Sequence, residues 1–149
     1  MLRFVFVFFS ATLVGCSGTR PVDIGMVDRQ LTNCPETPNC VSSDGDPLDE
    51  QHYVAALSAS GDPAMVWAAV RAAVEDLPRT TIVRETENYL YAESVSRIFR
   101  FVDDIEVHWR PSEGVVAVRS ASRIGRKDFG VNRKRIERLR ELLQVRLDS

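Results

Sequence analysis

Three consecutive cations, Arg133, Lys134 and Arg135, stand at the start of the last helical pattern in the chain. A helix N-terminus carries a partial positive charge, so cations are unfavourable there, while its free amide groups attract anions. Arg119 and Arg123 precede these residues on a predicted strand. We therefore predict that the five cations form a basic concavity that binds an anion. The open alternative is that nearby acidic residues compensate the cations, which then serve the fold.

Asp103, Ser120 and Ser122 form a second candidate group. The turn signal at residues 111–114 pairs the strands on either side of it, and side chains alternate between the faces of a strand. In this register the three polar residues fall together on the apolar face. A carboxylate there costs several kcal/mol unless it is paired. We predict a buried polar cluster, which is either structural or the floor of a polar pocket.

The opposite face of the same hairpin carries Asp104 and Glu106 beside Arg119 and Arg123. We interpret this pattern as an ordinary cross-strand charge lattice. His108 lies on the charged face too, away from the serines of the apolar face. A Ser-His-Asp triad needs its three groups together, so we predict no triad and assign no catalytic residue.

Strand and helix patterns position these groups. Residues 51–59 alternate as a strand, and Asp62 and Pro63 then open a helix with one apolar face. Four strands are predicted over residues 79–85, 89–97, 99–109 and 115–124, and a last helix over residues 132–147. The order β-α-β-β-β-β-α predicts an α+β fold, in which an antiparallel sheet of about five strands carries two helices on one face.

Residues 1–15 resemble the signal peptide of a bacterial lipoprotein. A short basic start precedes an apolar run that is too short to span a membrane, and residues 13–16 read Leu-Val-Gly-Cys. By this resemblance, cleavage falls before Cys16, which carries a diacylglyceryl group and a further acyl chain such as palmitate. Because a serine, Ser17, and not an aspartate follows the lipidated cysteine, the resemblance favours location at the outer membrane. We predict a signal peptide at 1–15, a lipidated tether at 16–32 and one globular domain at 33–149, facing the periplasm.

Two further cysteines, Cys34 and Cys40, remain once Cys16 is lipidated. In an oxidising compartment an even pair this close in sequence is most simply a disulfide. A metal site or a redox pair is the less favoured alternative, because the spacing is wider than C-x-x-C and no histidine lies nearby. We therefore predict that the two cysteines are bonded to each other.

Charge is unevenly distributed, although the formal net charge is only -2. Residues 119–140 hold nine Lys or Arg and two acidic residues. Such a cluster can bind nucleic acid, but an exported lipoprotein rarely meets it. We expect no nucleic-acid partner, and favour anionic lipid, glycan or peptide carboxylates. The acidic residues at 44–50 lack the spacing of a calcium loop, so we expect no metal and no cofactor.

Four stretches together resemble the family known as domain of unknown function 1499. They are PNCVSS at residues 38–43, FRFVDD at 99–104, VRSASRIG at 118–125 and DFGVNRKRI at 128–136. The resemblance covers about residues 33–143, nearly the whole predicted domain. It implies no reaction and carries no catalytic residue onto this chain.

Together these observations favour a lipid-anchored envelope protein that binds an anionic partner and is not an enzyme. One alternative is a hydrolase-type envelope enzyme with Asp103 and Arg123 or Arg133 in its site. Another is a structural partner of an envelope assembly. A deep polar pocket beside Asp103 favours the enzyme, a shallow basic face the binder, and a large exposed apolar patch the assembly partner.

Overall fold

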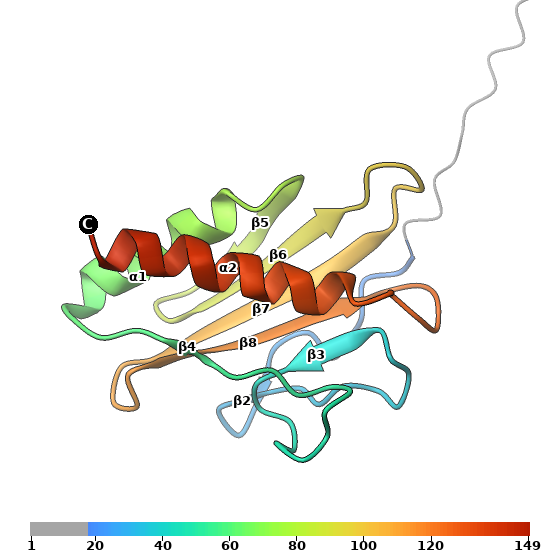
Figure 1. Ribbon diagram of the computed structural model, residues 1–149, viewed down its shortest axis with the longest axis horizontal. Coiled ribbons are helices and arrows are strands. Elements are labelled where there is room, and N and C mark those ends of the chain that lie inside the picture. The colour runs from blue at the N-terminus through green and yellow to red at the C-terminus, as the bar shows by residue number, and fades with distance from the viewer. Residues whose placement is uncertain (1–17) are drawn as a thin grey trace, which may run out of the picture.

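The computed structural model describes residues 18–149, so the predicted signal peptide and Cys16 lie outside the described residues. This part of the chain forms two helices, a six-stranded sheet and a two-stranded sheet (Figure 1). The predicted α+β fold is confirmed. The elements in chain order are β1 (Met26–Val27), β2 (Gln30–Leu31), β3 (Cys40–Ser42), β4 (Leu57–Ser58), α1 (Pro63–Glu75), β5 (Thr80–Glu85), β6 (Tyr89–Val95), β7 (Val102–Arg110), β8 (Val115–Ser122) and α2 (Val131–Leu147).

The large sheet is antiparallel and has the strand order β3-β8-β7-β6-β5. The short strand β4 also pairs with β8, near the other end of that strand from β3. In the β7–β8 hairpin, Asp103 lies opposite Ser122, which confirms the predicted register. A β-bulge interrupts the pairing of β5 with β6 between Ile82 and Arg84.

Both helices pack on one face of the large sheet, as predicted, and enclose the main core (Figure 1). Pro63 is in the first turn of α1, and the carboxylate of Asp62 accepts hydrogen bonds from two backbone amides of that turn. In α2 the buried apolar side chains Ile136, Leu139 and Leu143 recur at three- and four-residue spacing. Neither helix of the described chain is long and apolar enough to cross a membrane.

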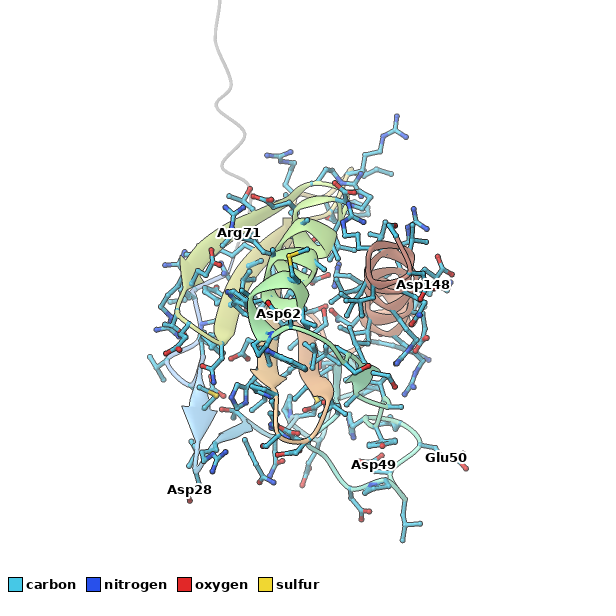
Figure 2. The ribbon with its side chains drawn as sticks, turned by 90° about the vertical axis from the view of Figure 1, so that its left-hand side faces the viewer. Asp28, Asp49, Glu50, Asp62, Arg71 and Asp148 are labelled. Atoms are coloured by element: carbon cyan, nitrogen blue, oxygen red, sulfur yellow. A yellow bond between two sulfur atoms is a disulfide. The ribbon has the colours of Figure 1, made fainter. Side chains whose placement is uncertain are left out.

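The opposite face of the sheet is covered by the N-terminal part of the described chain. Residues 20–32, predicted as a tether, instead pack against the sheet, where Leu31 forms a small second core with Tyr89. In Figure 2, Asp28 in the β1–β2 turn and Asp148 after α2 lie on opposite sides of the sheet. The sequence shows no period here because the segment is held by a few separate contacts rather than by one regular element.

Several element boundaries differ from those predicted. Only β4 forms within residues 51–59, and β3 arises where no strand was predicted. The strand predicted from residue 99 begins at Val102, because Arg100 has a left-handed φ of 58°. The disulfide between Cys34 and Cys40 is present, as predicted, and ties Cys34 to the first residue of β3.

Candidate functional site

The sheet separates the cations that we predicted to form one basic concavity. Arg119 binds Glu106 on the face under the N-terminal segment, whereas Arg135 binds Ser120 on the face under α2. Neighbouring residues of a strand point to opposite faces, so Arg119 and Ser120 diverge. The predicted concavity therefore does not form, and the N-terminus of α2 does not face Arg119 or Arg123.

The predicted cross-strand charge lattice forms, and it is buried. Glu106 is fully buried and accepts hydrogen bonds from Oη of Tyr89 at 2.7 Å, Nη1 of Arg119 at 2.9 Å and the amide of Gly25 at 2.8 Å. Burial raises the pKa of Glu106, while the hydrogen bonds from Tyr89 and Arg119 act in the opposite direction. Burial and the nearby Glu106 also raise the pKa of Tyr89. The N-terminal segment closes this network off from solvent.

Arg123 is the centre of a second network on the same face. It donates to Oδ1 of Asp104 at 2.7 Å and to Oη of Tyr91 at 2.8 Å, and it also binds Glu93 at 2.5 Å. Burial alone would lower the pKa of Arg123, but the hydrogen bonds to Asp104 and Glu93 outweigh burial and raise it. Arg20 of the N-terminal segment pairs with Glu93 as well. Arg123 is thus committed to internal partners.

The three cations at the start of α2 have different environments. Arg133 donates to backbone carbonyl oxygens of residues 50, 51 and 53 at 2.8–3.2 Å. Arg135 binds a buried carboxylate and a buried serine. Lys134 is exposed. The contacts of Arg133 and Arg135 favour the alternative that these two cations serve the fold.

The buried polar cluster around Asp103 has a member that sequence reasoning missed. Asp103 is 7% exposed and accepts from Nη2 of Arg135 at 2.6 Å. Oγ of Ser120 donates to Oδ1 of Asn132 at 2.6 Å, and Nδ2 of Asn132 donates to Oγ of Ser122 at 2.9 Å. The signal for Asn132 was its place on the buried stripe of α2, one turn before the first buried isoleucine.

An apolar groove of about 530 Å³ lies at one end of the sheet, beside Asp103. The loop between β6 and β7 contributes Phe99 and Phe101, whose stacked rings have centroids 5.5 Å apart. The loop between β8 and α2 contributes Phe129. Both loops lie at the right-hand end of Figure 1. We call this part of the domain, residues 96–101 and 123–131, the groove end.

Each serine and aspartate that lines the groove is already hydrogen-bonded within the fold. Ser96 accepts from the amide of Phe101 at 2.9 Å, and Asp128 accepts from two amides at the start of α2. Asp103 and Ser122 belong to the buried polar cluster. The groove therefore offers apolar surface to a ligand, and its carboxylates are compensated.

The two loops that form this apolar surface also carry cations, of which Lys127 lines the groove. Arg97 and Arg100 belong to one loop of the groove end, and Arg126 and Lys127 belong to the other. All four are exposed, and none forms an ion pair with a carboxylate of residues 18–149. Nζ of Lys127 lies 5.9 Å from the ring centroid of Phe129. These four cations are exposed positive charges of the groove end.

Sequence reasoning assigned the groove phenylalanines to other roles or passed over them. The sequence pattern predicts Phe99 and Phe101 in a strand, and Phe129 belongs to the family motif at residues 128–136. The sequence signal for them is that large apolar residues stand next to cations, with Arg100 between Phe99 and Phe101 and Lys127 two residues before Phe129. Exposed aromatic side chains in a loop lack a packing explanation.

The acidic segment at residues 44–50 is occupied by internal contacts. Asp44 accepts from the amide of Leu31 at 2.8 Å and pairs with Arg110. Hydrogen bonding to His52 lowers the pKa of Asp49. Within residues 18–149, no three His, Cys, Asp or Glu side chains are grouped to hold a metal ion.

The chain matches the family described as "Protein of unknown function (DUF1499)" over residues 30–143. The chain belongs to this family. The DUF1499 match includes every residue of the groove end and the whole polar cluster, but not residues 18–29 of the N-terminal segment. No curated protein matches the chain.

Proposed function

We propose that the protein is a lipid-anchored, non-catalytic binding module of the bacterial cell envelope, and that it binds an anionic partner at its groove end. The observation that carries this proposal is an apolar groove that Lys127 helps to line, formed by two loops that also hold the exposed cations Arg97, Arg100 and Arg126. Apolar walls bind hydrocarbon chains, and free cations bind a phosphate or carboxylate group. The partner is therefore an anionic amphiphile, which has both parts.

The engaged polar groups of the groove argue against the alternative enzyme. Asp103 is compensated by Arg135, so it is not a free base or nucleophile. Arg123 lies in the network on the other face of the sheet, and Arg133 is held by backbone carbonyl oxygens. The side chains suggested for a hydrolase-type site are thus separated or committed.

The anchor is proposed from the order of residues 1–16, with Cys16 as the lipidated residue. The disulfide between Cys34 and Cys40 supports an oxidising compartment. Two or three long acyl chains give a durable attachment, since each buried methylene contributes about 0.8 kcal/mol. We place the domain in the periplasm, on the outer membrane.

Replacement of the anchor residue tests the attachment. We expect Cys16→Ser to appear in the soluble periplasmic fraction or to remain as a precursor that keeps residues 1–15. Mass spectrometry of the wild-type N-terminal peptide should show a diacylglyceryl cysteine. A processed Cys16→Ser chain that still fractionates with outer membrane would contradict the anchor.

A soluble amphiphile tests the binding site. Dihexanoyl phosphatidylglycerol, kept below its micelle concentration, should shift the NMR resonances of Phe99, Phe101 and Phe129. Dihexanoyl phosphatidylcholine has the same chains and no net charge, so it should bind at least about fivefold more weakly. Shifts that are spread over the whole domain, or equal affinity for both lipids, would count against the proposed site.

A further inference from the structure

Large apolar side chains of the groove end are strongly exposed to solvent. Phe129 is 81% exposed and Phe99 is 69% exposed, and Ile98 and Val131 are exposed beside them. Arg100 and Phe129 have left-handed φ values of 58° and 55°, which are uncommon for these residues. Left-handed backbone at these exposed loop residues costs free energy, so we infer that the positions of the loops serve a function.

The composition of this end matches a lipid–water interface. Side chains such as Phe and Ile enter the boundary between headgroups and acyl chains, while Arg and Lys bind anionic headgroups. Arg97, Arg100, Arg126 and Lys127 are free to do so, because each lacks an internal carboxylate partner in the described chain. The acidic side chains that line the groove, Asp103 and Asp128, accept hydrogen bonds within the fold.

The described chain also begins at this end. A methyl group on Gly18 would lie 3.0 Å from Cβ of Arg123 and 3.5 Å from Cγ1 of Ile124, which lines the groove. Cys16 is two residues earlier, and two residues span at most about 7 Å. The proposed anchor is therefore joined to the described chain at Gly18, which lies beside the groove. In Figure 1 the C-terminus lies at the opposite end of the domain.

From these three observations we infer that the groove end docks on the surface of an anionic lipid bilayer. This inference rests on the proposed function and names its partner: a membrane lipid met in the bilayer and not a free amphiphile. In the docked state Phe99 and Phe129 enter the headgroup boundary and the four cations bind lipid phosphates. The groove then opens toward the acyl chains, while α1 and the β7–β8 turn point away from the membrane.

Vesicle co-sedimentation of an unlipidated chain tests docking apart from the anchor. Every helix and strand described within residues 18–149, and the disulfide, lies within residues 26–147, so a chain that begins at Ser17 keeps all of them. It should pellet with vesicles of phosphatidylglycerol and phosphatidylcholine in equal parts, and not with phosphatidylcholine alone. Salt at about 0.5 M should release much of it, because screening weakens the contribution of the cations.

Paired variants identify the surface. Phe99→Ser and Phe129→Ser should each weaken vesicle binding at least about tenfold. Arg97→Ser and Arg100→Ser should each weaken it about fivefold. The matched controls are Met65→Ser on α1 and Arg138→Ser on α2, which remove an exposed apolar and an exposed cationic side chain elsewhere.

Other results would contradict docking or assign the exposed patch to another partner. Equal losses in the control variants would overturn docking by the groove end. A chain that binds dihexanoyl phosphatidylglycerol but no vesicle would overturn docking and leave the proposed function standing. Binding to neither probe would end both proposals. Self-association that Phe129→Ser abolishes would assign the patch to a second copy of the chain instead.

Discussion

Nη2 of Arg135 lies 2.6 Å from Oδ2 of Asp103, and this contact joins the N-terminal part of α2 to the start of β7. Both side chains are nearly buried. Nη1 of the same guanidinium reaches Oγ of Ser120 at 2.9 Å. The pair explains why the fold tolerates a cation where the helix dipole disfavours one.

The first prediction concerns this ion pair. Asp103→Ala leaves Arg135 without its carboxylate and should lower the free energy of unfolding by about 1–3 kcal/mol. Arg135→Ala should lower it similarly. The double variant should lose less than the sum of the two, because each single change removes the same interaction. Urea denaturation of the three variants and the wild type measures this.

A control for this cycle lies on the exposed side of α2. Arg138 pairs with Glu141 there, and both side chains are more than half exposed. Arg138→Ala should change the free energy of unfolding by at most about 0.5 kcal/mol. Additive losses for Asp103→Ala and Arg135→Ala would show that the buried pair is not coupled.

The second prediction concerns the disulfide. Cys34 and Cys40 close a short loop directly before β3, so their bond should contribute only about 2 kcal/mol. The double variant Cys34→Ser/Cys40→Ser should remain folded, with a correspondingly lower denaturation midpoint. Protein taken from the envelope should show no free thiol at either position after alkylation and mass spectrometry. Two alkylated cysteines would disprove the bond in the exported protein.

The third prediction concerns pH. Burial, and then the charge of Arg110, lowers the pKa of His108 below its ordinary value of 6.5, and Nδ1 accepts from Nε of Arg110 at 3.3 Å. The unfolded state therefore binds more protons than the folded state below pH 6.5. The stability contributed by neutral His108 is present above pH 6.5 and is lost as the pH falls through its lower folded-state pKa. An NMR titration should give a midpoint below 6.5, and His108→Gln should flatten this part of the stability curve. A midpoint at or above 6.5 is the opposing result.

The fourth prediction separates the groove end from the core. Phe99→Ala and Phe129→Ala remove largely exposed rings, so each should change the free energy of unfolding by at most about 0.5 kcal/mol. Ile136→Ala removes a fully buried side chain of α2 and should cost about 2–5 kcal/mol. Thermal or urea unfolding compares the three. A large loss at Phe129 would mean that the ring supports the fold.

The fold was predictable where local patterns repeat. Asp62 and Pro63 predicted the start of α1. The alternation of apolar and polar residues on both sides of the turn at residues 111–114 predicted the register of β7 with β8. The same register placed Asp103 opposite Ser122. Helix caps and strand alternation involve residues that are close in sequence, so the sequence alone is enough to predict them.

The candidate site was harder to predict because distant contacts create it. The charges of Asp104 and Glu106 looked like a surface lattice, since nothing local shows that residues 20–32 cover them. The cations of α2 were assigned to one basic surface with Arg119, but the sheet lies between them. The groove end depends on two loops that only the tertiary fold brings together.

The bulge between Ile82 and Arg84 has a consequence for how these molecules behave when crowded. β5 ends the large sheet, so its outer backbone groups are open to another chain. Strand addition needs a flat and regular edge, whereas this one is kinked and carries the exposed charges of Arg84 and Glu85. The edge is therefore a poor template for aggregation, and concentrated copies of the domain are hindered from joining into a continuous sheet.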